Sequence, residues 1–239
     1  MPGIILLSGG LDSTVAMAQF LQNNQGGLAI TFDYGQRAAN QEIVSSRLIS
    51  EHYGVNHETI SLPFLARITK TSLVNRDFEV PVLESSDLDK VLEVTLSTAE
   101  QVWVPNRNGL FVNIAAAYAE SLGFNYVVTG FNAEEAATFP DNSPQFIAAT
   151  NQTLAYSTLN QVKLVSPTQN LNKMEIVKLG MSLDIPWDNL WSCYHAGERM
   201  CGKCESCQRL KRALKSQGFI DVSERLFGML GGCSSENPY

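Results

Sequence analysis

The stretch LLSGGLDSTVAM, residues 6–17, joins the end of an apolar run to the start of a segment with helical periodicity. The apolar run, residues 3–8, has the length and composition of a buried strand, and residues 12–21 are predicted to form a helix. The two glycines between them permit a tight turn that brings backbone N–H groups close to a ligand. The N-terminus of the helix adds free N–H donors and a positive dipole end. The stretch therefore predicts an anion-binding loop between a strand and a helix.

The same alternation of strand and helix continues along the chain. We predict further strands at residues 27–34, 57–62, 125–130 and 161–167, and further helices at residues 41–53, 110–122, 144–156 and 172–183. Residues 64–101 are polar and weakly periodic, so we expect there an insertion or loop with one short helix. This order is typical of an α/β fold with a doubly wound parallel sheet. We predict such a domain over residues 1–190 and a small C-terminal helical region over residues 191–239.

Composition and charge exclude several classes of protein. The net charge is −7 and the sequence pI is near 5.0, whereas a broad nucleic-acid-binding face needs clustered lysine and arginine. The start, MPGIILLSGG, lacks the basic region and cleavage site of a signal peptide. The apolar runs are far shorter than the ~20 residues of a membrane span. We expect a soluble cytoplasmic protein with neither a membrane nor a nucleic acid as its direct partner.

Four of the five cysteines are gathered near the C-terminus with the spacing C-x7-C-x2-C-x2-C. They are Cys193, Cys201, Cys204 and Cys207. Four thiolates complete a tetrahedral shell, and zinc is the usual metal of a closed four-cysteine site. An iron–sulfur cluster, a redox-active pair and a zinc knuckle that binds nucleic acid are the alternatives. We predict one structural zinc ion, with His195 as a loop residue and Cys233 as a free thiol.

A basic run begins within this quartet and extends beyond it. It consists of Lys203, Arg209, Lys211, Arg212 and Lys215. We expect these side chains to form the solvated face of a helix, with contact to a phosphate as the alternative.

The glycine turn at residues 8–14, SGGLDST, has a simple structural interpretation, in which Asp12 or Ser13 only caps the helix. The stretch lacks the G-x-x-x-x-G-K-[ST] pattern of a Walker loop, so it is not a nucleotide site of that kind. SGGLDST resembles instead the SGGxDS loop of the PP-loop ATP pyrophosphatase superfamily. In that superfamily the loop grips ATP while a substrate oxygen attacks the α-phosphate. The resemblance implies that residues 1–190 bind a nucleotide.

Four further stretches narrow the resemblance. They are TFDYGQR (31–37), VPNRN (104–108), GFNAEE (130–135) and WSCYHAGERMCGKCESC (191–207). In this order they resemble the 7-cyano-7-deazaguanine synthase family of queuosine and archaeosine biosynthesis. The resemblance implies an ATP-dependent carbon–nitrogen ligase that converts 7-carboxy-7-deazaguanine and ammonia to the nitrile, through an activated carboxylate and then an activated amide. It also implies ATP, Mg²⁺ and one structural Zn²⁺, with free ammonia as the nitrogen source.

The resemblance assigns residues to three roles. The ATP-binding set is Leu7, Ser8, Gly9, Gly10, Leu11, Asp12, Ser13, Thr14, Phe32, Tyr34 and Arg37. The catalytic set is Asp12, as the magnesium ligand, with the cations Arg107 and Lys173. The substrate set is Asn132, Glu134, Glu135, Phe139 and Asp141.

Several of these assignments have plain structural alternatives. Arg37 could pair near a helix start, and Arg107 could anchor a loop through Asn106 or Asn108. Lys173 could be a surface residue in the first turn of a helix. Glu134 and Glu135 could be solvated acids at a helix start.

The chain departs from the family pattern in one loop. It reads GFNAEEAATFPDNS over residues 130–143, where many members read roughly GVNxxDYSGYPDCR, and VPNRN stands for the more usual VPGRN. This departure leaves open a relative that couples the activated carboxylate to another amine. Another PP-loop tRNA-modification enzyme, such as one for tRNA thiolation, and a non-catalytic nucleotide-sensing or nucleic-acid-binding module are further alternatives. The segment RLFGMLGG, residues 225–232, could pack against a second copy in a homodimer.

Overall fold

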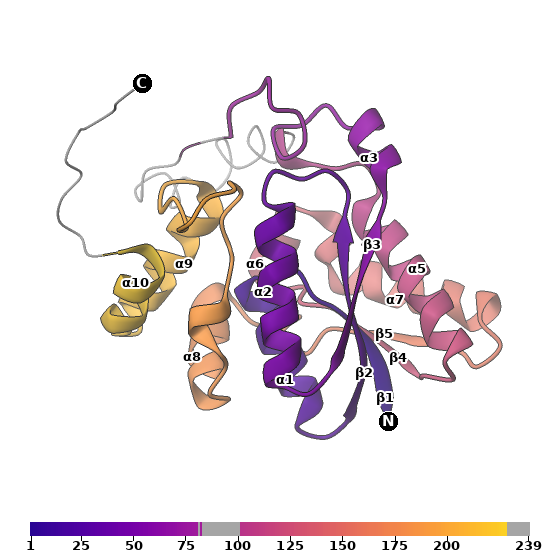
Figure 1. The fold of residues 1–239 in the computed structure, drawn as a ribbon. Helices are drawn as coiled ribbons and strands as arrows, with labels where there is room; N and C mark the ends of the chain where they lie inside the picture. The colour runs from indigo at the N-terminus through magenta and orange to yellow at the C-terminus, as the bar shows by residue number, and fades with distance from the viewer. Residues whose placement is uncertain (81, 83–100, 229–239) are drawn as a thin grey trace.

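The computed structural model describes residues 1–80, 82 and 101–228 and shows one parallel sheet between two layers of helices (Figure 1). The strands are β1 (Pro2–Leu6), β2 (Gln25–Asp33), β3 (Asn56–Ser61), β4 (Tyr126–Val128) and β5 (Lys163–Val165). Their order is β3-β2-β1-β4-β5, and every neighbouring pair is parallel. The predicted doubly wound α/β fold is confirmed.

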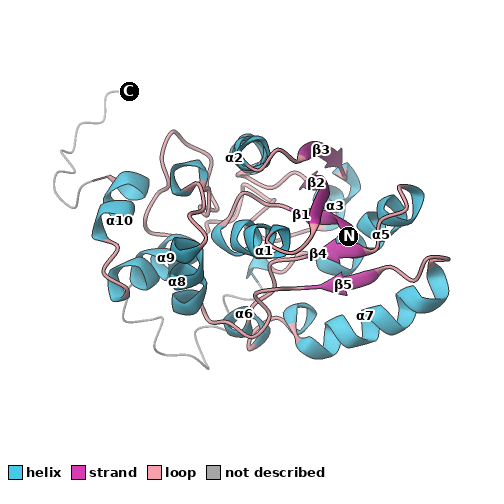
Figure 2. Ribbon diagram, turned by 90° about the horizontal axis from the view of Figure 1, so that it is seen from below, coloured by secondary structure: helices cyan, strands magenta, loops and turns pink. Residues whose placement is uncertain are grey.

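Helices cover both faces of this sheet, as Figure 2 shows. On one face lie α1 (Leu11–Leu21), α2 (Ala39–His52) and α8 (Lys173–Ser182); on the other lie α3 (Pro63–Ile68), α5 (Arg107–Ser121) and α7 (Pro144–Ser157). Shorter elements are α6 (Ala133–Ala136) and the 3-10 helices η2 (Pro140–Asn142) and η3 (Trp187–Asn189). The chain continues through α9 (Glu205–Ser216) and α10 (Ile220–Phe227).

The strands read as continuous apolar runs because both of their faces are covered. Successive side chains of a strand point to opposite faces, so Ile4 and Val127 pack under α5 while Ile5 and Val128 pack under α1 and α8. All four are at most 1% exposed. The sheet therefore separates two hydrophobic cores.

The C-terminal helices belong to one of these cores. Leu210 and Leu214 of α9 are fully buried in the same cluster as Ile176 of α8. The division of the chain at residue 190 stays a prediction, and the core is continuous across it. Cys233 and part of RLFGMLGG lie outside the described residues, as do residues 83–100 of the expected insertion, where the described part holds the short helix α3.

Two predicted strands are shorter than expected. β4 and β5 each have three residues, and after β4 the chain passes the start of α1. At Gly130 a Cβ atom would lie 2.5 Å from the backbone nitrogen of Ser13. Only a glycine permits this close approach, which ties the end of β4 to the anion-binding loop.

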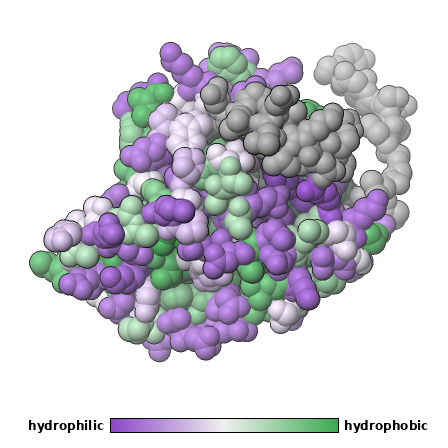
Figure 3. Space-filling model, turned by 180° about the vertical axis from the view of Figure 1, so that it is seen from behind, coloured by the Kyte–Doolittle hydropathy of each residue, from purple (hydrophilic) through white to green (hydrophobic). Residues whose placement is uncertain are grey.

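One face of the molecule, opposite that of Figure 1, shows a mixed distribution of hydrophilic and hydrophobic residues (Figure 3). Among the described helices, none combines the length and the hydropathy needed to cross a membrane.

Candidate active site

A cavity of about 320 Å³ opens at the carboxyl ends of β1, β2 and β4. The strand order reverses here, because β1 is followed by β2 and β3 on one side and by β4 on the other. Ligands of open α/β sheets bind at such a switch point. Two segments that are far apart in the sequence also line the cavity: residues 102–104 before α5 and residues 191–194 after η3.

Ser8 and Gly10 of the SGG turn line the cavity, and Gly9 joins them. Gly9 has a φ of 75°, and its carbonyl accepts a hydrogen bond of 2.8 Å from the Trp191 backbone N–H. Gly10 is the N-cap of α1, and no side chain caps the helix. The Ser13 hydroxyl bonds to the Gly10 carbonyl and meets the Ser8 hydroxyl at 3.2 Å, so it stabilises the turn. The interpretation of Asp12 or Ser13 as a simple cap is therefore wrong, and the first turn of α1 is available to an anion.

A first prediction concerns the packing of this turn. A Cβ atom on Gly9 would lie 2.5 Å from the Ser45 hydroxyl on α2, in addition to the strain of a positive φ. We expect Gly9→Ala to destabilise the protein by about 2–3 kcal/mol. Gly54→Ala is the matched control, since Gly54 has a φ of 64° but nothing within 4 Å of the added Cβ. Urea unfolding measures both; equal losses for the two variants would show that the α2 contact is not a constraint.

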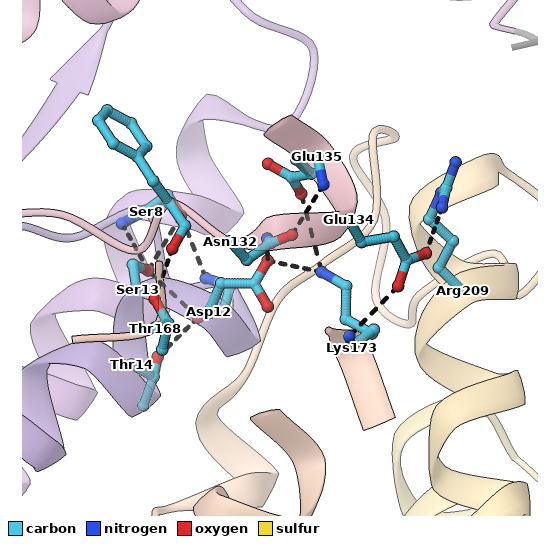
Figure 4. A network of polar contacts seen from close by, with 12 residues as sticks. Ser8, Asp12, Ser13, Thr14, Asn132, Glu134, Glu135, Thr168, Lys173 and Arg209 are labelled. Atoms are coloured by element: carbon cyan, nitrogen blue, oxygen red, sulfur yellow. Dashed lines mark hydrogen bonds and ion pairs between the residues drawn. The ribbon is translucent and has the colours of Figure 1, made fainter. Parts of the chain in front are cut away.

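Asp12 and Lys173 form a buried ion pair beside the turn (Figure 4). The Lys173 Nζ lies 2.5 Å from Oδ2 of Asp12, and the Asn132 side-chain amide donates to the same oxygen at 3.2 Å. Burial raises the pKa of Asp12, and the positive charge of Lys173 opposes this rise. Burial lowers the pKa of Lys173, but the carboxylates of Asp12 and Glu135 outweigh it and leave the pKa above its usual value. Lys173 therefore carries its charge into the cavity, and the surface alternative for it is wrong.

The other oxygen of Asp12 is fit to hold a cation. Oδ1 is buried and has no hydrogen-bond partner among the described residues. An unpaired carboxylate oxygen beside an anion-binding turn suits Mg²⁺, which takes one or two carboxylates together with phosphate oxygens. Bound there, the ion would neutralise charge on the phosphates.

Glu134 and Glu135 are neighbours with different surroundings. Glu135 lines the cavity, and its carboxylate lies 3.8 Å from Nζ of Lys173. Glu134 points the other way, toward α9 (Figure 4). Its carboxylate pairs with Arg209 and accepts a hydrogen bond of 3.2 Å from the Lys173 backbone N–H. Arg209 also pairs with Glu205 at 2.8 Å, so the expectation of a fully solvated basic face is wrong at Arg209.

A second prediction follows from this pair. Burial is the largest single influence on the pKa of Glu134 and raises it, but the charge and hydrogen bond of Arg209 and the contacts with Lys173 together outweigh burial, and the pKa lies below its usual 4.5. The pair therefore stabilises the fold above that pH and loses its effect as pH falls through the lowered pKa. We expect Arg209→Met to cost about 2 kcal/mol at pH 7. The difference from the unmodified protein should shrink below pH 4.5, as measured by urea unfolding.

The control is Arg225→Met, which removes exposed ion pairs to Asp188 and Asp221. Exposed pairs contribute little, so we expect a much smaller change. A loss at Arg209 that is independent of pH would contradict a charge-based contact.

The two predicted arginines have different places. Arg37 donates to the backbone carbonyls of Ser72, Asn75 and Phe78, and it does not line the cavity. Its contacts favour the structural alternative for that residue. Arg107 lines the cavity and donates to the Tyr34 hydroxyl at 3.2 Å. Its Nε also donates to the Asn108 side chain at 3.4 Å. Arg107 therefore lines the cavity and also makes one of the contacts expected of a loop anchor.

The structure brings most of the predicted residues to one cavity. Lining it are Leu7, Ser8, Gly10, Leu11, Asp12, Ser13, Phe32, Tyr34, Arg107, Glu135, Phe139, Asp141 and Lys173. Gly9, Thr14, Arg37, Asn132 and Glu134 do not line it. The Thr14 hydroxyl donates to the Gly10 carbonyl at 2.8 Å, and so it supports the turn from beneath.

Sequence reasoning missed several lining residues. They are Gln36, Glu42, Trp103, Phe111, Trp191, Ser192 and Tyr194. Gln36 was within the quoted TFDYGQR stretch, and its side-chain amide donates to Glu42 at 2.8 Å. Trp103, Trp191 and Tyr194 adjoin or fall within quoted stretches, and this proximity of aromatic residues to a motif was the available signal.

The four predicted cysteines meet in space. Their sulfur atoms all lie within 4.8 Å of one another, with Cys201 to Cys207 at 3.9 Å and Cys193 to Cys204 at 4.0 Å. A tetrahedral ion with bonds of about 2.3 Å to sulfur has edges of about 3.8 Å, so the cluster fits such a metal. Backbone N–H groups of His195 and Cys201 donate to the Cys193 sulfur at 3.3 Å. Through its first ligand the cluster also touches the cavity, which Cys193 lines.

Comparison with known proteins agrees with this geometry. The model of the family described as "Queuosine biosynthesis protein QueC" matches residues 3–218. The 7-cyano-7-deazaguanine synthase of Carboxydothermus hydrogenoformans is 59% identical over 88% of this chain and 96% of that protein. Those of Pelotomaculum thermopropionicum and Methanosarcina mazei are 54% and 49% identical, over 91% and 95% of this chain and 98% and 99% of theirs. A family model that spans nearly the whole chain, and relatives this similar over their full length, assign the chain to an enzyme family: it belongs to the queuosine biosynthesis protein QueC family.

Proposed function

We propose that the chain is a 7-cyano-7-deazaguanine synthase that uses ATP to convert 7-carboxy-7-deazaguanine and ammonia to the nitrile. The observation that carries the proposal is the meeting of Lys173 and Asp12 at the uncapped N-terminus of α1, inside the cavity. A cation, an unpaired carboxylate oxygen and free backbone donors are together what a phosphate group in displacement chemistry requires. The name of the relatives, 7-cyano-7-deazaguanine synthase, supplies the product.

The chemistry divides into two activations. In the first, a carboxylate oxygen of the substrate attacks the α-phosphorus of ATP, and pyrophosphate leaves. Ammonia then attacks the activated carbonyl carbon, loses a proton and displaces AMP, which leaves the amide. In the second, the amide oxygen attacks another ATP, and loss of AMP with the remaining amide protons forms the nitrile. Lys173 balances the charge that develops on the departing pyrophosphate in both steps.

The cofactors and partners are part of the proposal. Asp12 Oδ1 would hold Mg²⁺, and the four cysteines would hold one Zn²⁺ in a structural role. Small molecules are the proposed partners, with ammonia taken from solution, and no nucleic acid is required. A homodimer and a cytoplasmic location stay predictions.

The test is product formation by the purified protein. Incubation with 7-carboxy-7-deazaguanine, ammonium, ATP and Mg²⁺ should yield the nitrile by mass spectrometry and AMP with pyrophosphate by phosphorus NMR. Consumption of ATP without nitrile, even with ammonium in excess, would overturn the proposal and favour coupling of the activated carboxylate to another amine. The altered loop at residues 130–143 is the feature that favours this second function, the coupling of the activated carboxylate to another amine.

A further inference from the structure

Two pairs of nearly parallel aromatic rings line the cavity. Phe32 and Phe111 stack with their ring centroids 4.1 Å apart and an interplanar angle of 16°. At this distance the two rings are in direct contact, and their facing surfaces are not open to a ligand. Trp103 and Phe139 are also nearly parallel, at 13°, but their centroids are 6.1 Å apart. The second pair is the wider one, but its separation is less than the ~7 Å that a ring inserted between two others requires, so a ligand would contact these rings from the cavity side, which both of them line.

The wider pair is built from two separate segments. Trp103 lies in the segment that precedes α5, and Phe139 lies between α6 and η2. The backbone N–H of Phe139 donates to the Glu135 carbonyl at 2.8 Å, which fixes its place relative to the Lys173 side of the cavity. Both rings are partly exposed, whereas Phe32 is only 5% exposed. Part of each side chain is thus exposed in the cavity.

A carboxylate stands beside this pair. Asp141 lies in η2, two residues after Phe139, and lines the same cavity. The Asn142 side-chain amide donates to its Oδ1 at 3.1 Å. Burial raises the pKa of Asp141, and the nearby charge of Arg107 opposes this. A carboxylate has about four acceptor sites, so this one retains capacity for a ligand with two donors.

On the basis of the proposed function, we propose that the deazaguanine base stacks on Trp103 and Phe139 and that Asp141 accepts hydrogen bonds from its N–H edge. A guanine-like edge presents a ring N–H and an exocyclic amine side by side, and a carboxylate accepts from both. Adenine presents an amine beside a ring nitrogen that is itself an acceptor. Asp141 therefore favours the deazaguanine over the adenine of ATP, because a lone pair would oppose the carboxylate in the second case.

The orientation brings the reacting group to the right side of the cavity. Glu135 lies along the cavity wall and acts electrostatically on Asp141, while its own carboxylate is 3.8 Å from Lys173. In the proposed orientation, the carboxylate of a base held at Asp141 points along this wall toward Lys173 and the turn of α1. The Phe32 and Tyr34 side of the cavity is then left to the nucleotide.

The test separates binding of the base from binding of the nucleotide. Calorimetry measures the Kd of 7-carboxy-7-deazaguanine, and separately that of a non-hydrolysable ATP analogue, for the full chain. We expect Trp103→Ala to raise the Kd of the base about 10- to 100-fold and to leave that of the analogue unchanged. Trp103→Phe should keep most of the affinity but show less quenching of tryptophan fluorescence by the base, with the remainder due to Trp191, which also lines the cavity. Asp141→Asn should raise the Kd of the base at least about 10-fold.

The control is Tyr156→Ala, since Tyr156 is an aromatic residue on α7 that is 95% exposed. We expect it to change neither Kd. A folded Trp103→Ala variant that binds the base as the unmodified protein does, or that weakens only the ATP analogue, would overturn the inference. Failure of the unmodified protein to bind 7-carboxy-7-deazaguanine would overturn both the inference and the proposed function. Nitrile formation at an unchanged KM by Trp103→Ala would overturn the inference alone.

Discussion

Lys173→Met is expected to lower kcat/KM for nitrile formation about 1000-fold while the protein stays folded. Nζ of Lys173 lies 2.5 Å from Asp12 and is oriented into the cavity at the N-terminus of α1. A fixed cation in a cavity of low dielectric stabilises charge that develops in the transition state, and loss of one such group costs about 100- to 1000-fold in rate. Methionine keeps the length and much of the volume of lysine without its charge.

The removal has a second consequence at Asp12. The charge of Lys173 holds down the pKa of that carboxyl against the effect of burial, so the pKa should rise further in the variant. We therefore expect the residual activity to fall off at a higher pH than in the unmodified protein. Steady-state kinetics over a series of pH values measures the shift, in which the acidic limb of the profile moves to higher pH.

Lys178→Met is the matched control, because Lys178 lies on the same helix α8 and is exposed. It should leave kcat/KM and the pH profile unchanged. A folded Lys173→Met variant that retains more than about one tenth of the activity would show that the cation is not required at the reacting phosphate.

Cys204→Ser is expected to release the bound metal and to lower Tm by about 10 °C or more. Cys204 is fully buried, and its sulfur is part of a cluster whose members lie within 4.8 Å of one another. Binding of a structural zinc ion is coupled to folding, so loss of one ligand removes much of that stabilisation. Mass spectrometry for metals should give about one zinc per unmodified chain and almost none in the variant.

The effect should reach the nucleotide site. The Trp191 backbone N–H holds the Gly9 carbonyl, and the segment that contains it leads directly into the first ligand, Cys193. We expect the variant to bind the ATP analogue more weakly as well. Cys233→Ser is the control, since Cys233 stands outside the quartet and should change neither the metal content nor Tm. Retention of a full equivalent of metal by Cys204→Ser, or iron with a visible absorption band in the unmodified protein, would contradict a zinc site of four cysteines.

The role of Glu134 illustrates what sequence reasoning could not reach. From the sequence it was placed with Glu135 in the substrate set, with a solvated helix start as the alternative. In the structure its carboxylate faces Arg209 and the Lys173 backbone, at separations of 75 and 39 residues in the chain. Neither interpretation included that contact, because no local pattern marks a pair formed between α6 and α9. The substrate role of Glu134 remains a prediction, and its contacts favour a structural role.

Arg37 shows a related limit. Its presence in TFDYGQR suggested the nucleotide, whereas its guanidinium reaches three backbone carbonyls between residues 72 and 78. The TFDYGQR motif correctly indicated that β2 ends there and that a turn follows it. The direction of one long side chain depended on a loop some 35 residues further along.

By itself the sequence determined the features that depend on neighbouring residues. Apolar runs of strand length, helical periodicity and the SGG turn predicted the parallel α/β fold and its anion-binding loop, and the close spacing of the cysteines predicted a metal cluster. Such features are local, because the period of a helix or strand and the reach of a short loop fix them. Only the tertiary structure decided which distant side chains meet: Lys173 with Asp12 across 161 residues, and Trp103 with Phe139 in one cavity. The order of the strands makes those contacts, since it brings the carboxyl ends of β1 and β4 together, and that order is set by the packing of the whole sheet.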